Sequence, residues 1–238
     1  MQLHEHNADI LELPSGTIMF PNEPHIACVL LLDTSGSMSS NGGAPIANLN
    51  KAIKTFKGQI CSDIVARNRV DVAIVEFNDT VRVSQDFIPI SLFEPEEFRG
   101  YGVTAMGFGI NESIDLLKER LRFYREIGTN YFRPWIFMIT DGAPTDDLSS
   151  AKERLFAEIE KRKLEFWALG VNGYDKEILK SLTKKSIDLE EADFAEIFDW
   201  LGKSMITISK SRVDEKITLP ELPNNACFLD MKWQEISS

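Results

Sequence analysis

One aspartate and two serines on alternate positions follow an apolar run close to the start of the chain. The stretch VLLLDTSGSM, residues 29–38, ends its apolar part at Asp33 and then places Ser35 and Ser37 on alternate positions. One carboxylate and two hydroxyls at a turn of the chain are the kind of ligands that a hard cation prefers. Short polar turns after strands are common, so the prediction of a metal site needs support from elsewhere in the sequence.

Two further residues supply that support. Asp141 directly follows the apolar run WIFMIT, and Thr104 opens a predicted helix after a glycine-containing loop. In an open parallel sheet, ligands bind in the crevice beyond the carboxyl ends of the strands. We therefore expect five residues to meet at one edge of the sheet: Asp33, Ser35, Ser37, Thr104 and Asp141.

The chemistry of this set favours Mg²⁺. All five side chains offer oxygen, and a small hard cation of this kind takes octahedral oxygen ligands at roughly 2.0–2.1 Å. Mn²⁺ and Ca²⁺ share the preference for oxygen, whereas zinc sites usually contain His or Cys. Two carboxylates and three neutral hydroxyls leave the ion electrophilic, so it could accept one more anion.

The elements that would position these residues alternate along the chain. Short apolar runs predict buried strands at about 26–32, 70–77, 134–140 and 164–169. The alternating segment 80–90 predicts a further strand, joined to 70–77 as a hairpin by the Asn78–Asp79 turn. Apolar residues at helical spacing lie between the runs, from Ile46 to Ile60 and from Ile114 to Tyr124. This order predicts an α/β, doubly wound, Rossmann-like fold, with a mostly parallel sheet, one antiparallel edge strand and helices on both faces.

Polar residues near the helix starts have simpler interpretations. Ser150 and Glu153 form a capping-box pattern, which predicts a helix start at Ser150. Asp146 and Asp147 precede that helix, and we interpret them as a solvated loop rather than as further metal ligands. His4, His6 and His25 lie outside the metal pattern, and we expect no ligand role for them.

Composition limits the classes of partner. The net charge of -11 and the pI near 4.9 disfavour nucleic acid and anionic membranes, which need clustered Lys and Arg. Three widely separated cysteines without a CxxC motif predict reduced thiols and neither disulfides nor zinc. The N-terminal residues do not form a basic segment followed by an apolar one, and the longest apolar run, 26–32, is too short to span a bilayer. We expect a cytoplasmic protein and leave its oligomeric state open.

Taken together, three motifs resemble a known site. DTSGS at 33–37, GVTAMG around Thr104 and ITDG at 139–142 are similar to the metal-ion-dependent adhesion site of von Willebrand factor type A domains. The resemblance covers about residues 25–210, with 1–24 as an N-terminal extension and 211–238 as a C-terminal tail packed on or extending from the domain. The loop departs slightly from the family pattern, with Gly102–Val103 where a Gly-Gly pair is common.

The resemblance implies roles for the five residues. Ser35, Ser37 and Thr104 would be hydroxyl ligands, Asp33 and Asp141 would bind directly or through water, and an Asp or Glu of a protein partner would complete the coordination. The compact DTSGSM start, the DGAPTDD loop and the proline-bearing tail are most similar to the bacterial tellurium-resistance-associated group. That similarity implies a scaffold in stress or resistance signalling, not an enzyme.

Two alternative functions use similar elements. A Mg²⁺-dependent phosphatase of the haloacid dehalogenase type also places an Asp after a strand, but it needs a second carboxylic acid two positions later, where this chain has Ser35. A nucleotide-binding Rossmann domain needs the G-x-G-x-x-G spacing, and the glycines of GSMSSNGG at 36–43 do not have it. A metal-dependent interaction module remains the preferred prediction.

Overall fold

A computed structural model describes residues 10–13 and 16–229 of the chain. Its strands are β1 (Ile10–Leu13), β2 (Gly16–Met19), β3 (Ile26–Asp33), β4 (Val70–Phe77), β5 (Val81–Pro89), β6 (Trp135–Thr140), β7 (Glu165–Val171), β8 (Ser186–Leu189) and β9 (Ala226–Phe228). Its α-helices are α1 (Ser40–Ser62), α2 (Ile64–Arg69), α3 (Met106–Glu126), α4 (Ser149–Glu160), α5 (Lys176–Leu182) and α6 (Ala195–Lys210), and a 3₁₀ helix spans Gly36–Ser39.

Seven of these strands form one twisted sheet in the order β5-β4-β3-β6-β7-β8-β9. The strands β4, β3, β6, β7 and β8 run parallel, and the predicted hairpin places β5 antiparallel at one edge. The fold class predicted from the sequence is confirmed. The structure adds a second antiparallel edge strand, β9, which pairs with β8 through only three residues and is too short to show a sequence period.

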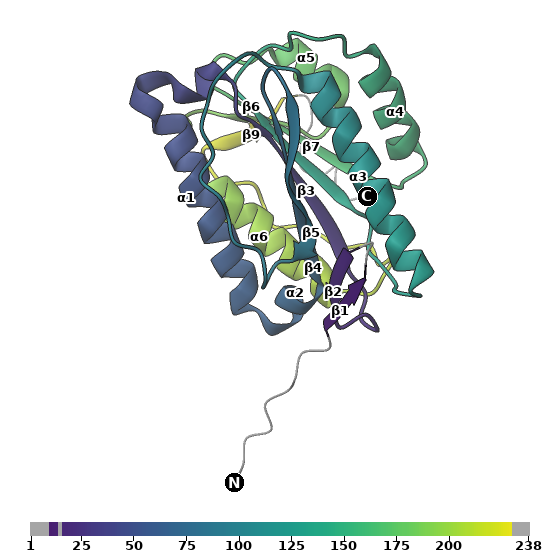
Figure 1. Cartoon of the computed structure of the whole chain (residues 1–238). Coiled ribbons are helices and arrows are strands. Elements are labelled where there is room, and N and C mark those ends of the chain that lie inside the picture. Colours follow the sequence, from purple (N-terminus) through teal and green to yellow (C-terminus); the bar gives the residue numbers. More distant parts are fainter. Residues whose placement is uncertain (1–9, 14–15, 230–238) are drawn as a thin grey trace.

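Helices cover both faces of the sheet (Figure 1). On one face, α1, α2 and α6 pack against the even-numbered side chains of β3, such as Leu30. On the other, α3, α4 and α5 pack against the odd-numbered side chains, such as Val29 and Leu31. Because both faces are covered, β3, β4 and β6 are buried at every position, as continuous apolar runs predict.

The first long helix begins irregularly, close to the candidate site. Asn41, Gly42 and Gly43 have positive φ angles of 51°, 71° and 84°, so the regular helix follows Gly43. Pro45 lies in its first turn, where no backbone N–H is needed. The predicted apolar stripe from Ile46 to Ile60 is buried. The segment 36–43 is therefore a 3₁₀ turn and a kink, not a phosphate-binding loop of the Rossmann type.

The predicted helix start at Ser150 is wrong by one residue, and its capping box is absent. The helix α4 begins at Ser149, and the cap comes from Asp147, whose Oδ1 accepts from the Ser149 N–H at 3.1 Å and from Ser149 Oγ at 2.7 Å. At the start of α6, Asp193 Oδ1 likewise accepts from the Ala195 N–H at 3.1 Å. A carboxylate in the loop before the helix can replace a serine as the cap because either oxygen accepts the same bond.

A buried charged cluster ties the start of the sheet to α3. Asp71 Oδ2 accepts from Arg120 Nη2 at 2.8 Å and from Tyr124 Oη at 2.5 Å, and it lies 3.0 Å from His25 Nδ1. All four side chains are buried. Burial by itself would raise the pKa of Asp71, but Arg120 and His25 more than offset it and lower the pKa to about 2. His25, which the sequence leaves without a role, is thus part of the core.

The segment after α6 returns along the domain. Ile217, Leu219 and Leu222 pack against the core, and Trp200 Nε1 donates to the carbonyl of Pro220 at 2.8 Å. Inside the core, the Trp135 ring stacks on that of Trp167, which meets Trp200 edge to face. Trp233, His4 and His6 lie outside the described residues. Within the described part of the chain, no helix is both long enough and apolar enough to cross a membrane.

Candidate metal site

The structure gathers the five predicted residues at the carboxyl ends of two neighbouring strands. Asp33 is the last residue of β3, and Ser35 and Ser37 follow it in the turn that leads into the 3₁₀ helix. Asp141 comes directly after β6, which pairs with β3. Thr104 lies two residues before α3. This end of the strands lies at the top of the view in Figure 1.

Four of the five residues form a continuous chain of hydrogen bonds. Ser37 Oγ donates to Asp141 Oδ1 at 2.5 Å, and Ser35 Oγ lies 2.9 Å from Ser37 Oγ. The Ser35 N–H donates to Asp33 Oδ1 at 2.8 Å. Residues that are 104 positions apart in sequence therefore share one small space, and their oxygens face one another.

Thr104 reaches the same space from the side of Gly142. A β-carbon on Gly142 would lie 3.1 Å from Thr104 Oγ1 and 3.9 Å from Asp33 Oδ2. The backbone of Thr104 is fixed, because its carbonyl accepts from the Thr145 N–H at 2.9 Å. Glycine at 142 keeps open the space between the threonine hydroxyl and the aspartate, and a larger residue there would fill it.

Burial makes the two carboxylates unusually costly to ionise. Asp33 is fully buried and Asp141 is 6% exposed. Loss of hydration raises the pKa of Asp33 above its ordinary value. It also raises the pKa of Asp141 to about 6, with a further contribution from the nearby negative charge of Asp33. Two crowded carboxylates with raised pKa values are typical of functional sites, and a nearby cation would favour their ionised forms.

A second layer of polar residues holds the candidate ligands in place. Thr140 Oγ1 donates to Asp33 Oδ2 at 2.6 Å. Asn78 Nδ2 donates to Thr34 Oγ1 at 3.1 Å, and the Asn78 carbonyl accepts from the Ala105 N–H beside Thr104. Neither Thr140 nor Asn78 was predicted in these roles from the sequence. Their positions in the sequence could have indicated these roles, since each is a polar residue at the end of a buried strand.

The loop that carries Thr104 packs closely on the serine turn. The Gly36 N–H donates to the Gly102 carbonyl at 3.0 Å. Gly102 has a φ of 74°, and a side chain there would collide with the Asp79 carboxylate, which accepts from the Val103 N–H. Glycine is therefore required at 102, and Val103 in place of a second glycine is accommodated because its side chain is exposed.

Asp146 has a role other than metal binding. Its carboxylate accepts from the Gly107 and Phe108 N–H groups at 3.1 and 2.8 Å, and so caps the first turn of α3 from a different loop. Asp147 caps α4. Both carboxylates accept hydrogen bonds from backbone N–H groups, which refines the interpretation of Asp146 and Asp147 as a solvated loop. Together they lock the 141–149 loop against the helix that follows Thr104.

The donor set suits a hard cation rather than zinc. Across the residues described by the structure, no three His, Cys, Asp or Glu side chains gather where they could hold a metal. The candidate site instead offers two carboxylates and three hydroxyls around the space beside Gly142. Oxygen ligands with this modest negative charge fit Mg²⁺ or a similar ion and leave part of the coordination to water or to an outside anion.

Exposed apolar side chains surround this edge. Tyr101, Val103 and Phe108 are 58, 51 and 65% exposed, and they flank Thr104 on both sides in sequence. Large apolar side chains that remain exposed next to a polar site are typical of surfaces that bind another protein.

Comparisons with known proteins agree with this architecture. The family model of the von Willebrand factor type A domain matches residues 28–199. A search of curated proteins finds no match. Solved structures with the same fold include a von Willebrand factor type A protein from Catenulispora acidiphila, with 13% identity and a TM-score of 0.57 over 80% of this chain and 44% of that one.

Two further solved structures show the same fold. The pilus adhesin SpaC from Lactobacillus rhamnosus GG has 16% identity and a TM-score of 0.60 over 79% of this chain and 31% of that one. The ArnB paralog VWA2 from Sulfolobus acidocaldarius has 14% identity and a TM-score of 0.51 over 77% and 46%. This chain spans less than half the length of these structures. The family model covers well over half of the chain, and the chain belongs to the von Willebrand factor type A family.

Proposed function

We propose that this chain is a Mg²⁺-dependent protein-interaction module that captures an acidic side chain of its partner. The observation that carries the proposal is the hydrogen-bonded chain from Asp33 through Ser35 and Ser37 to Asp141, with Thr104 beside it. These residues would hold the ion, which would supply a positive charge and a coordination position for a carboxylate of the partner.

The chain's own residues support binding rather than catalysis. A phosphatase of the haloacid dehalogenase type needs a carboxylic acid two positions after Asp33, and Ser35 stands there with its hydroxyl 2.9 Å from Ser37. The exposed Tyr101, Val103 and Phe108 give a partner apolar surface to cover around the ionic contact. The net charge of -11 would repel an acidic partner in the absence of a cation.

The test is a metal-dependent capture. The purified protein is immobilised and exposed to cell lysate in 5 mM Mg²⁺ or in EDTA, and the retained proteins are identified by mass spectrometry. We expect one or more proteins to be retained only with Mg²⁺, and to be lost with the Ser35→Ala/Ser37→Ala variant. Neutralising one Asp or Glu of the captured partner should abolish capture, because that carboxylate completes the site.

A matched variant separates the site from the rest of the surface. Ser39→Ala/Ser40→Ala changes two nearby exposed serines that make no contact with the site carboxylates, and we expect capture to persist. Equal capture in EDTA would contradict the proposal. Mg²⁺-dependent hydrolysis of an aryl phosphate that is abolished by Ser35→Ala/Ser37→Ala would favour the phosphatase alternative.

We also infer the cellular setting, from the resemblance to the tellurium-resistance-associated group. Cys28, Cys61 and Cys227 are free thiols, as expected for a reducing, cytoplasmic environment. The proposal is therefore a bacterial stress-response scaffold. It is tested by asking whether proteins encoded beside this gene co-purify with the chain in Mg²⁺ and not in EDTA. If only unrelated proteins were captured, the stress-response setting would be contradicted. The proposal of a metal-dependent interaction module would not be.

A further inference from the structure

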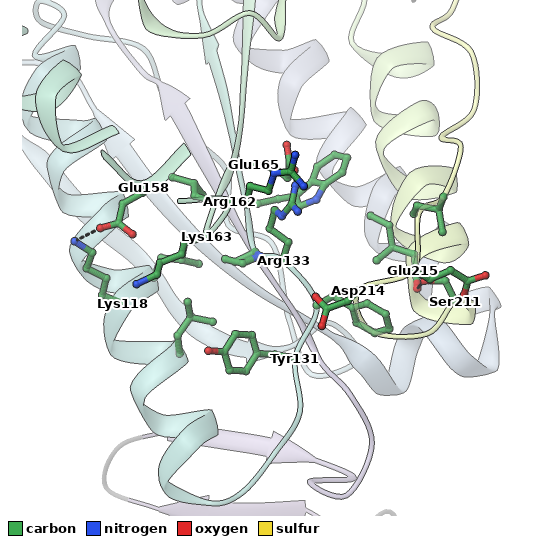
Figure 2. A pocket seen from close by; sticks show the side chains of 18 of the residues that line it. Lys118, Tyr131, Arg133, Glu158, Arg162, Lys163, Glu165, Ser211, Asp214 and Glu215 are labelled. Carbon is green, nitrogen blue, oxygen red and sulfur yellow. Dashed lines mark hydrogen bonds and ion pairs between the residues drawn. The ribbon is translucent and has the colours of Figure 1, made fainter. Parts of the chain in front are cut away.

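A large cleft lies at the opposite end of the sheet, where β6 and β7 begin (Figure 2). It has a volume of about 1030 Å³. One wall is the second half of α3, and the other is the segment 211–219 that follows α6. Typical sites for small ligands have about 300–1,000 Å³. The cleft is therefore large enough for a segment of another protein.

The charge of the cleft is opposite to that of the whole chain. Nine of its 25 lining residues are Lys or Arg and four are acidic, whereas the chain has 26 Lys and Arg in 238 residues and a net charge of -11. Basic side chains have been gathered here on an otherwise acidic molecule. An acidic ligand would be attracted to this cleft and repelled by most of the remaining surface.

Several of these cations lack a partner within the chain. Lys118 forms an ion pair with Glu158 at 2.8 Å, and Glu165 forms ion pairs with both Arg133 and Lys185. Six others form no ion pair among the residues that the structure describes, and all six are exposed: Arg122, Arg125, Arg162, Lys163, Arg212 and Lys216. Arg125 Nη1 donates to Tyr131 Oη at 3.1 Å instead. In Figure 2, Arg162 and Lys163 lie between α3 and the segment after α6.

Arg162 occupies a position that favours glycine. It has a φ of 53°, its N–H donates to the Ile159 carbonyl, and the Lys163 N–H donates to the Glu158 carbonyl. These two bonds form a Schellman motif at the end of α4, in which the residue with positive φ is usually glycine. An arginine at this strained position contributes nothing to the turn itself. Its presence there is explained if its charged side chain is needed in the cleft.

The floor of the cleft is apolar and the charges lie around it. Leu117 and Leu121 of α3 and Ile217 of the last segment contribute aliphatic surface. Trp135 is only 3% exposed and Phe132 only 4%, so neither offers a face on which a nucleic acid base could stack. Glu158, Glu165, Asp214 and Glu215 interrupt the basic rim, which disfavours a continuous phosphate backbone.

We propose that this cleft is a second docking site, which binds a protein segment with spaced acidic residues and apolar residues between them. The acidic residues would pair with the free cations of the rim, and the apolar ones would cover the floor. Since β6 runs from Trp135 in the cleft to Thr140 beside Asp141, the two sites lie about 20 Å apart at opposite ends of one strand. A segment bound in the cleft would therefore make no contact with a metal at the candidate site.

The test uses a synthetic peptide in EDTA, which removes any contribution from the metal site. A fluorescein-labelled 12-residue peptide of Glu, Leu and Gly in equal numbers is titrated with the protein, and its anisotropy is followed. Two matched peptides replace every Glu by Gln or every Leu by Ser. We expect the parent peptide to bind, both matched peptides to bind at least fivefold more weakly, and the affinity to fall between 50 and 300 mM salt.

Two variants assign binding to the cleft. Arg122→Glu/Lys163→Glu should weaken binding at least tenfold. Arg162→Gly should weaken it severalfold without lowering the melting temperature, because glycine relieves the strained backbone; this result cannot come from misfolding. Lys51→Glu/Arg67→Glu makes the same charge change at exposed cations on α1 and α2 that form no ion pair with any described residue, and it should bind as the unmodified protein does.

Three outcomes would overturn the proposal. They are equal binding by the cleft variants and the unmodified protein, equal binding by the Gln peptide and the parent peptide, and tighter, Arg122-dependent binding of a 12-nucleotide RNA or of tripolyphosphate. The last outcome would identify the cleft as a phosphate site instead. None of these results bears on the metal-dependent capture, because every titration is performed in EDTA.

Discussion

At the scale of single residues, the candidate site combines neutral and charged oxygens with different tasks. Ser35 and Ser37 bridge Asp33 and Asp141 without adding charge. Two ionised carboxylates this close repel each other, and their burial adds a desolvation cost. The arrangement therefore weakens the folded state on its own, and a bound cation would relieve both costs.

The first prediction follows from that conflict. Asp141→Ala should abolish the binding of Mg²⁺ and leave the melting temperature in EDTA at pH 8 unchanged or slightly higher, because one of two repelling charges is removed. Isothermal titration calorimetry measures the binding, and differential scanning calorimetry measures the stability. Asp146→Ala is the comparison, since it should keep metal binding and lose stability through the uncapped start of α3. A severe loss of folding in Asp141→Ala would make this residue structural.

The second prediction concerns pH. The pKa of Asp141 in the folded protein is raised to about 6 by burial and by Asp33. Protons should therefore compete with the metal below pH 6, and the affinity for Mn²⁺ should fall about tenfold per pH unit there while changing little between pH 7 and 8. The stability of the protein in EDTA should change with pH in the opposite direction to the metal affinity. A raised carboxylate pKa means that the free energy of unfolding increases as the pH falls from above 6 toward 4. A constant affinity from pH 8 to 5 would contradict the role of Asp141.

At the scale of elements, the strands place the site and the loops complete it. The strands β3 and β6 are neighbours, so their ends bring Asp33 and Asp141 together without any contribution from loop length. The loop before α3 is then fixed by Asp79 and Asp146 from two other loops. At the far end of the sheet, the cluster around Asp71 fixes α3 against β4.

The third prediction tests that cluster. Arg120→Met should lower the free energy of unfolding by about 3–5 kcal/mol, because it leaves the buried Asp71 without its main counter-charge. Urea unfolding at pH 7 measures the change. Arg122→Met, two positions along the same helix and exposed, should change the free energy by less than about 0.5 kcal/mol. If Arg120→Met cost less than about 1 kcal/mol, the buried pair would not be an important source of stability.

The same cluster gives a pH dependence of known sign. The folded pKa of Asp71 is lowered to about 2, so its contribution to stability is fully present above pH 4 and is lost as the pH falls toward 2. This loss is separate from the titration of Asp141, which occurs near pH 6. Because Arg120→Met removes the main cation that lowers this pKa, the free energy of unfolding of the variant should fall less between pH 4 and pH 2 than that of the unmodified protein.

The sequence predicts long, strongly patterned elements and misses the short ones. The four apolar runs match β3, β4, β6 and β7 within two residues at each end, because a strand buried on both faces is a continuous apolar run. The elements α2, α5, β8 and β9 have at most seven residues and too little pattern to detect. The five residues of the candidate site were found because strand ends in a parallel sheet converge.

Other features depend on contacts that no single segment contains. Asp71 lies inside an apolar run, so a buried partner could have been expected, but its identity as Arg120 depends on how α3 packs. The cap on α4 is Asp147 rather than Ser150, because the helix begins at Ser149 and the carboxylate of Asp147 reaches its first N–H. The basic cleft joins α3, the turn after α4 and the last segment, which are far apart in the sequence.

At the scale of the whole molecule, the two ends of the sheet differ in charge and in chemistry. The carboxyl end holds buried acids and exposed apolar side chains, and the amino end holds a cleft lined with cations. An acidic partner segment could reach the amino end through charge alone, whereas at the carboxyl end it would need a cation. With both proposed sites, the molecule would be able to bind two partners, or two segments of one partner, at separate surfaces.

The last prediction concerns the stability of the whole fold. A ligand that binds only the folded state stabilises it by about 2.7 kcal/mol at a concentration 100 times its Kd. For a chain of this size, that corresponds to a rise in melting temperature of roughly 5–10 °C. We expect Mg²⁺ or Mn²⁺ at saturating concentration to produce such a rise in differential scanning calorimetry, and EDTA to reverse it. The rise should be absent in Ser35→Ala/Ser37→Ala and present in Arg122→Glu/Lys163→Glu, because the cleft lies at the other end of the strands. If millimolar metal produced no shift, the site at Asp33 and Asp141 would not be a metal site. A rise that persisted in the double serine variant would place the metal elsewhere on the protein.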